Sequence, residues 1–374
     1  MTITTLKPFH PGHYLQSKAS NSSATSDLEL ALQQGFVGAL VDLPWAQLEP
    51  RPGQYDFTIL IEYLRWAEKN NRRLIGMVFD RDFKAGCGKS KTVPGWVDCA
   101  PFNAKRANRG CIAKIWAPAV NNRRIALIEA IAAQFDGHPN LEALALPETA
   151  LGGITPQSQP GYTREGYRDE IIRLIHAVAP ALKQTMLFQS MNWLGPDDGS
   201  YLDMIAQAFV ETGVGGITNP DSLWWEKKPM YGTMQRYAGR IPIMVGGDVS
   251  QLLDPDNNKH YKGVGELVGG QYRFAVEELG GNYVLWNPWF VNPNSPSGTH
   301  SAAYRAAIAR LVADERNATV TAVPAVLRPA PGGEEPETPA PTIDIAAIQA
   351  WLKEADDLPA QVAAWLARGK ALVG

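Results

Sequence analysis

Short apolar runs alternate with longer amphipathic stretches along most of the chain. The runs are rich in Val, Ile, Leu and Met, and the stretches between them place apolar residues at helical spacing. This alternation is typical of β-strands and α-helices that follow one another on a parallel sheet. Eight runs are predicted to be strands, namely residues 10–16, 37–43, 74–79, 141–147, 185–189, 215–218, 241–245 and 283–286.

The stretches between the runs carry start signals of helices. Thr163 precedes an amphipathic run, and Ser26 with Glu29 has the spacing of a capping box, whose side chains bond free backbone amides of the first turn. Eight strands with helices between them predict an α/β protein with a closed (β/α)8 barrel, the TIM barrel, over residues 1–318. The predicted helices are residues 27–34, 58–70, 122–135, 164–179, 201–212, 230–238, 261–279 and 301–316.

The composition changes beyond the predicted barrel. Residues 323–342 contain many Pro with Gly and Glu and no aromatic residue, which predicts a Pro-rich extended linker over residues 319–342. Residues 343–374 are predicted to form a short C-terminal helical hairpin that carries Trp351 and Trp365. Two interpretations of this hairpin stay open: it folds back on the barrel, or it mediates docking or oligomerisation.

Charge and hydropathy argue against two classes of partner. The 374 residues carry a net charge of −3, and Lys and Arg gather only in a local cluster around residues 84–109, so no nucleic-acid partner is predicted. The N-terminus lacks the apolar run of a signal peptide, and no stretch approaches the roughly 18 apolar residues that span a membrane. We therefore expect no membrane span and a cytoplasmic or virion-associated protein.

Three cysteines, Cys87, Cys99 and Cys111, lie at equal spacing in one segment. An odd number leaves at least one thiol unpaired, and no His lies beside them at the spacing of metal ligands. Unpaired thiols are the expected state. One disulfide and a metal site are the alternatives.

Candidate chemistry follows from the barrel prediction, because the active site of such a barrel lies at the carboxyl ends of its strands. Polar residues after the apolar runs are rich in carboxylates and Trp and poor in His and Cys. Hydrolysis of an acetal needs two carboxyl groups, and aromatic side chains can hold the sugar, so this set favours a glycosidase without metal or organic cofactor. The predicted substrate-binding residues are His13, Asp42, Trp45, Asp80, Asn192, Trp193, Asn219, Asp221, Trp224, Trp286 and Trp289.

Glu148 is the sharpest single candidate for a catalytic carboxylate. It directly follows Leu-Glu-Ala-Leu-Ala-Leu-Pro, a predicted strand that is apolar almost to its last residue. A carboxyl group at the rim of such a strand is partly desolvated, which favours its protonated form and suits a proton donor. A salt-bridged rim Glu without a catalytic role is the alternative.

Residues 43–57, Leu-Pro-Trp-Ala-Gln-Leu-Glu-Pro-Arg-Pro-Gly-Gln-Tyr-Asp-Phe, resemble the strand-2 segment of the clan A TIM-barrel glycoside hydrolases, the group of cellulase and β-galactosidase type. Pro94-Gly-Trp96 resembles a loop element of the same group more weakly. The resemblance covers about residues 10–316 and places the acid/base carboxylate at the end of strand 4, on Glu148. It places the nucleophile at the end of strand 7, on Asp248.

The chain departs from the family pattern at two positions. Pro147 precedes Glu148 where many members have Asn, and Asp248 stands where those enzymes have Glu. A retaining enzyme needs its carboxyl groups about 5–5.5 Å apart and an inverting one about 6.5–9.5 Å, so the shorter Asp248 leaves both mechanisms open. Asp221 is the alternative second carboxylate.

Together these features predict a glycoside hydrolase that cleaves a polysaccharide or oligosaccharide with two carboxylates, with retention as the favoured outcome. The main alternative is a non-catalytic carbohydrate-binding barrel tethered in a larger assembly, such as a phage or surface particle. A barrel aldolase or isomerase is a third interpretation, which depends on Gly246-Gly247 as part of a phosphate site.

Overall fold

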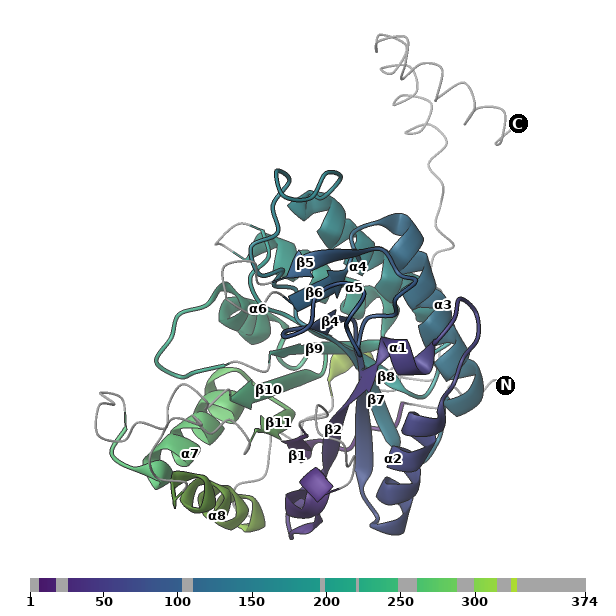
Figure 1. Ribbon diagram of the computed structural model, residues 1–374. Helices are drawn as coiled ribbons and strands as arrows, with labels where there is room; N and C mark the ends of the chain where they lie inside the picture. The colour runs from purple at the N-terminus through teal and green to yellow at the C-terminus, as the bar shows by residue number, and fades with distance from the viewer. Residues whose placement is uncertain are drawn as a thin grey trace, which may run out of the picture. The chain divides into compact units, whose positions relative to one another are not determined.

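Eight parallel strands close into a barrel in the computed structural model, which describes residues 7–17, 26–102, 110–195, 199–219, 222–247, 261–287, 299–314 and 324–327. The order around the barrel is β1-β2-β3-β7-β8-β9-β10-β11, and β11 pairs with β1 to close it (Figure 1). The (β/α)8 fold predicted from the sequence is confirmed. The strands are β1 (Gly12–Gln16), β2 (Phe36–Pro44), β3 (Arg73–Phe79), β7 (Leu141–Leu146), β8 (Met186–Ser190), β9 (Gly215–Asn219), β10 (Ile243–Gly247) and β11 (Tyr283–Trp286).

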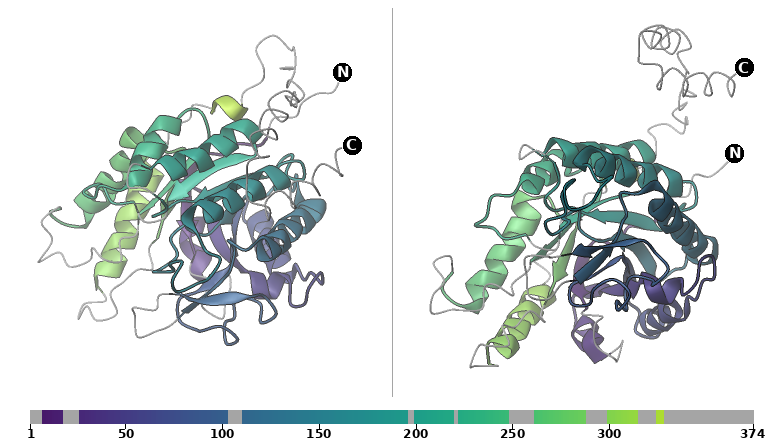
Figure 2. Two further views of the ribbon diagram at one scale, coloured as in Figure 1. Left: turned by 90° about the horizontal axis from the view of Figure 1, so that it is seen from above. Right: turned by 45° about the horizontal axis from the view of Figure 1, so that its top comes forward.

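Helices surround the strands on the outside of the barrel (Figure 2). Helix α4 begins where predicted, because the hydroxyl of Thr163 accepts a hydrogen bond of 2.9 Å from the Gly166 amide. The first predicted helix is instead a 3-10 helix, Ser26–Leu32, and a π-helical turn, Phe274–Glu278, continues α7. The α-helices are α1 (Trp45–Leu48), α2 (Thr58–Lys69), α3 (Pro118–Phe135), α4 (Arg164–Val178), α5 (Ser200–Thr212), α6 (Pro229–Tyr237), α7 (Val264–Arg273) and α8 (Thr299–Ala313).

The barrel strands are buried on both faces. One core fills the barrel interior and the other lies between the strands and the helices, which explains why the strands appear in the sequence as continuous apolar runs. The interior core includes Tyr14, Leu40, Ile75, Met77, Ala143, Ala145, Met186, Phe188, Met244, Tyr283 and Leu285.

Glu142 is a buried carboxylate at the amino end of β7. It lies at a β-bulge, because Leu74 pairs with Leu141 and the next residue, Ile75, pairs with Ala143. Its carboxylate accepts hydrogen bonds from the Tyr283 hydroxyl, at 2.6 Å, and from the His10 amide, at 2.8 Å. These bonds compensate the buried charge, so Glu142 stabilises the end of the barrel opposite the predicted active site.

The segment between β3 and α3 holds a second sheet that the sequence patterns did not predict. Its three antiparallel strands follow the order β4-β6-β5. They are too short, at two to four residues, to show an apolar period. Their bounds are Arg81–Asp82 for β4, Cys99–Phe102 for β5 and Gly110–Ala113 for β6.

A disulfide joins Cys87 to Cys99 in this segment, while Cys111 is a free, buried thiol. The expectation of three unpaired thiols was therefore wrong for two of them. Equal spacing in the sequence did not reveal that the turn before β5 brings Cys87 close to Cys99. The disulfide ties the loop that follows β4 to the start of β5.

The described residues all belong to the first of two compact units, residues 1–328. The predicted linker, residues 319–342, lies outside the described residues except for the short helix Ala325–Leu327 and Pro324 before it. The predicted hairpin, residues 343–374, lies wholly outside them. These domain boundaries stay predictions.

In the described part of the chain, no helix is long and apolar enough to cross a membrane.

Candidate active site

Glu148 lies just beyond the carboxyl end of β7, with 19% of its side chain exposed. The side-chain amide of Asn192, which follows β8, donates a hydrogen bond of 2.7 Å to Oε2 of Glu148. This bond fixes the orientation of the carboxyl group and leaves part of it open to solvent. The arrangement is that of a carboxyl group that can exchange a proton with a bound molecule.

Asn192 is itself held by the neighbouring loop. Its backbone amide donates to the Thr149 hydroxyl at 2.8 Å, and that hydroxyl donates to the Asn192 carbonyl at 3.1 Å. Thr149 and Asn192 are both buried, so these two bonds join the loops after β7 and β8 in a fixed geometry. Thr149 therefore positions Glu148 indirectly, through Asn192.

Arg81 is a buried cation beside Glu148 that the sequence interpretation did not include. Its Nη1 lies 4.0 Å from Oε1 of Glu148 and donates to the carbonyl of Ala150 at 2.9 Å. Its Nε donates to Oδ1 of Asp80 at 3.0 Å, and Arg124 approaches Oδ2 of Asp80 at 3.2 Å. Asp80 thus compensates two buried guanidinium groups, and Arg81 adds positive charge next to the candidate acid.

Four polar side chains face the barrel interior near the carboxyl ends of their strands. Asp42 and Ser190 each follow an interior residue, Leu40 and Phe188, by two positions, so they share its inward direction. Thr218 pairs with Ser190 in register, and Gln16 pairs with Leu40. We call Gln16, Asp42, Ser190 and Thr218 the barrel floor.

Among the residues that the structure describes, three atoms of the barrel floor have no hydrogen-bond partner. They are the buried hydroxyls of Ser190 and Thr218 and the side-chain carbonyl oxygen of Gln16. An unpaired buried polar group costs about 1–3 kcal/mol, so such groups normally meet water or a ligand. The barrel floor can therefore offer hydrogen bonds to hydroxyl groups of a bound molecule.

The pKa of Asp42 is raised from 3.8 to about 7, because burial removes water from its carboxylate. Asp42 in the barrel floor therefore takes up a proton near neutral pH. A protonated carboxyl group can donate a hydrogen bond as well as accept one, which suits it to a sugar hydroxyl.

Replacement of Asp42 by Asn is expected to change the pH dependence of stability. Because the folded pKa lies above that of the unfolded chain, the protonated carboxyl stabilises the fold fully below about pH 4, and this contribution is lost as the pH rises through about 7. Wild-type stability should fall across this window by roughly 2–4 kcal/mol more than that of Asp42→Asn. Urea unfolding at several pH values measures the difference. Equal pH slopes for the two proteins, or the same change in the control Asp169→Asn at an exposed carboxylate of α4, would contradict this expectation.

Several predicted substrate-binding residues lie in the core rather than on the surface of the site. Trp45 is fully buried and its indole donates to Glu49 at 2.9 Å. Trp286 is 1% exposed and its indole donates to Nδ1 of His13 at 3.1 Å. Asp80 and Asn219 are also fully buried. Both Trp side chains and Asp80 are held by protein partners, so we assign them to the support of the site and not to contact with a ligand.

Trp193 and Trp224 differ in how much of the ring is accessible to a ligand. Trp193, next to Asn192, is 53% exposed and presents its ring at the carboxyl end of the barrel. Trp224 is half-buried against Trp225, with ring centroids 5.0 Å apart, and its indole nitrogen has no hydrogen-bond partner in the described part of the chain. Trp193 is the better candidate for stacking on a sugar ring.

The predicted residues Asp221, Asp248 and Trp289 lie outside the described residues. Asp248 directly follows Gly247, the last residue of β10, so its place in the sequence is at the carboxyl end of the seventh barrel strand. Its role as the second carboxylate stays a prediction.

In the described parts of the chain, no group of three or more His, Cys, Asp or Glu side chains could hold a metal ion.

No protein-family model matches the sequence, and no curated protein sequence matches it. Solved structures do match the fold. A GH5_18 protein from Streptomyces cattleya in complex with GlcNAc is 14% identical with a TM-score of 0.52, over 84% of this chain and 83% of that one. The catalytic domain of a β-amylase from Paenibacillus polymyxa is 10% identical with a TM-score of 0.52, over 80% and 98% of the two chains.

A β-galactosidase from Rahnella sp. R3 is also similar, with 10% identity and a TM-score of 0.50 over 82% of this chain and 57% of that one. All three are glycoside hydrolases, the class to which the strand-2 segment shows its resemblance. At identities this low, the likeness establishes the barrel fold and leaves the activity open.

Proposed function

We propose that the protein is a glycoside hydrolase in which Glu148 is the general acid/base. The observation that carries the proposal is the carboxyl group of Glu148 at the end of the fourth barrel strand, partly exposed, fixed by Asn192 at 2.7 Å and close to Arg81 at 4.0 Å. A glycosidase needs such a positioned proton donor where parallel barrel strands end. The glycosidase barrels among the structural neighbours support this assignment.

The reaction uses a second carboxylate, which we assign to Asp248 by its position in the sequence after β10. In a retaining reaction, Glu148 protonates the oxygen of the leaving sugar while Asp248 attacks the anomeric carbon and forms a glycosyl ester. Glu148, now ionised, then removes a proton from water, and the water oxygen displaces Asp248. Hydrolysis consumes one water and restores both carboxyl groups.

The remaining side chains of the site supply binding. Trp193 offers an exposed ring for stacking, and the hydroxyls of Ser190 and Thr218, which bond no described residue, offer hydrogen bonds to sugar hydroxyls. Arg81 lies near enough to Glu148 to stabilise its carboxylate once the proton has left. The substrate is a polysaccharide or oligosaccharide.

Proton NMR of the first products tests this function. Incubation with a panel of polysaccharides and oligosaccharides should yield a new reducing end whose anomeric configuration equals that of the cleaved bond. Inversion would overturn the role of Asp248 as nucleophile and favour its role as a base. Failure to cleave any glycan that the protein binds would overturn the hydrolase function and favour a carbohydrate-binding barrel.

A further inference from the structure

The segment between β3 and α3 concentrates positive charge in a chain that is negative overall. Residues 84–102, which we call the basic loop, contain three Lys residues and one acidic residue, Asp98, a net charge of +2, whereas the whole chain carries −3. The proposed hydrolysis does not use this charge. The basic residues are Lys84, Lys89 and Lys91.

All three lysines of the basic loop are exposed, and within the described residues none of them forms an ion pair. Lys114 differs, because its ammonium group lies 3.0 Å from Asp98. The basic loop therefore presents exposed cations to solvent, which attract anions.

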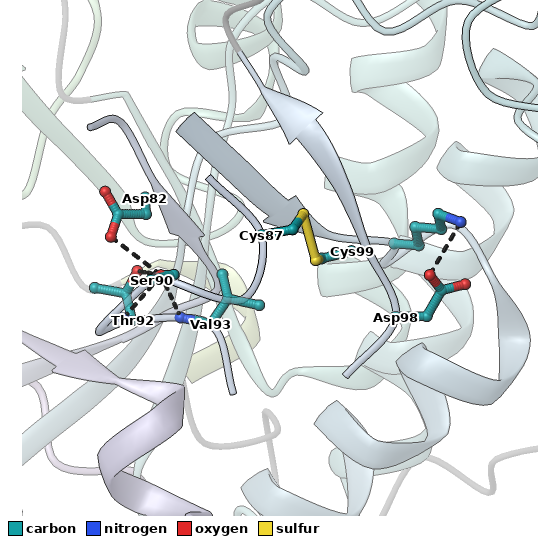
Figure 3. The surroundings of a disulfide bond; sticks show 8 residues. Asp82, Cys87, Ser90, Thr92, Val93, Asp98 and Cys99 are labelled. Atoms are coloured by element: carbon teal, nitrogen blue, oxygen red, sulfur yellow. Dashed lines mark hydrogen bonds and ion pairs between the residues drawn. A yellow bond between two sulfur atoms is a disulfide. The ribbon is translucent and has the colours of Figure 1, made fainter. Parts of the chain in front are cut away.

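The backbone that carries these lysines is held in a fixed conformation. The disulfide between Cys87 and Cys99 closes the loop, and Ser90 bonds Asp82 at 3.1 Å and accepts from the Val93 amide at 3.0 Å (Figure 3). Because little chain entropy remains to be lost, a preorganised group of cations binds an anion more tightly than a flexible one.

The basic loop starts at the same end of the barrel as Glu148. It follows β4, whose Arg81 lies 4.0 Å from the Glu148 carboxylate. Phe83, beside Lys84, is 43% exposed and packs its ring on Phe102 with centroids 5.2 Å apart. An exposed ring next to exposed cations suits a ligand that combines sugar rings with acidic groups.

We propose that the basic loop binds the acidic groups of an anionic polysaccharide, so that the substrate class is a glycan that bears carboxylate or sulfate groups. This inference rests on the proposed function, because it concerns the substrate of the same site. Exposed lysines at the carboxyl end of β3 hold the acidic groups of the glycan while the glycosidic bond to be cleaved lies at Glu148.

Binding to immobilised or soluble glycans tests the proposal without turnover. Glu148→Gln serves as the parent protein, and its basic-loop variant adds Lys84→Glu, Lys89→Glu and Lys91→Glu. The matched control adds Arg65→Glu, Lys69→Glu and Lys183→Glu, three exposed residues on α2 or before β8, away from the carboxyl ends of the strands. The glycans are polygalacturonate for carboxylates, chondroitin sulfate for sulfates, and xylan or dextran as neutral chains, with double-stranded DNA as a polyanion without acidic sugars.

The parent should bind at least one anionic glycan more tightly than the neutral ones. The basic-loop variant should lose about tenfold or more of that affinity, because three charge contacts disappear, while the matched control changes by less than about twofold. Equal binding of neutral and anionic glycans, an unaffected basic-loop variant, or DNA bound as tightly as the glycans would overturn the proposal. Cleavage of neutral glycans only would overturn the anionic-glycan proposal and keep the hydrolase function. Specific binding of an anionic glycan that the wild type does not cleave would keep the anionic-glycan proposal and overturn the hydrolase function.

Discussion

Replacement of Glu148 by glutamine is expected to lower kcat on a glycan about 10²- to 10⁴-fold, the usual contribution of a general acid/base. Gln has nearly the same shape, so the hydrogen bond to Asn192 can be kept with the amide flipped, and the fold should be unchanged. Steady-state kinetics on a cleaved glycan measures the effect. Glu129→Gln, at an exposed position on α3, is the matched control and should keep wild-type kcat.

The leaving group of the substrate distinguishes two possible roles of Glu148, that of a proton donor and that of a residue that only supports the site. An aryl glycoside whose phenol leaves without protonation does not need the acid in its first step, so Glu148→Gln should retain much more of kcat/KM, which reports that first step, on the aryl glycoside than on a natural glycan. An equal loss on both substrates would show that Glu148 acts in binding or folding and not as the proton donor.

Replacement of Asp80 by asparagine is expected to lower the free energy of unfolding by about 3–5 kcal/mol, because it leaves two buried guanidinium groups without their counter-ion. Asp80 is fully buried, with Arg81 at 3.0 Å and Arg124 at 3.2 Å. Chemical unfolding of the variant and the wild type gives the difference directly.

Asp98→Asn provides the contrast for Asp80→Asn. Its carboxylate pairs with Lys114 at 3.0 Å, but 64% of the Asp98 side chain is exposed, so the loss should stay below about 1 kcal/mol. If Asp80→Asn proves as stable as Asp98→Asn, Asp80 does not hold the two arginines together, and its predicted role in substrate binding becomes the better assignment.

The barrel could be predicted from the sequence because its strands are buried on both faces. Runs such as Leu141–Leu146 are apolar at nearly every position, and the helices between them show a clear period, so element order alone indicates the closed sheet. The position of Glu148 followed from the same reasoning, since a residue that follows a barrel strand lies at the end of the barrel where that strand ends.

The direction of side chains could not be predicted from the sequence. The strand-end rule selected Trp45 and Asp80 as ligand contacts, yet both point into the protein and are fully buried. It overlooked Arg81, one residue beyond Asp80, because a lone Arg after a strand normally lies in solvent. Only the packing of Asp80 between Arg81 and Arg124 shows why this Arg is buried beside Glu148.

Loops held by long-range contacts could not be predicted from the sequence patterns either. The small sheet of the β3–α3 segment has strands too short for a period, and the pairing of Cys87 with Cys99 depends on the path of the chain between them. The local cluster of Lys and Arg could be read from the composition, but the exposure of Lys84, Lys89 and Lys91 could not.

The most direct test of the account is the release of reducing ends from a glycan panel by the wild type and by Glu148→Gln, with glycan binding measured in parallel. The account predicts that the wild type cleaves at least one glycan, and that Glu148→Gln binds the same glycan with similar affinity but releases reducing ends at least about 100-fold more slowly. Cleavage at the wild-type rate by Glu148→Gln would contradict the central role of Glu148. Binding without cleavage by the wild type would contradict the hydrolase itself.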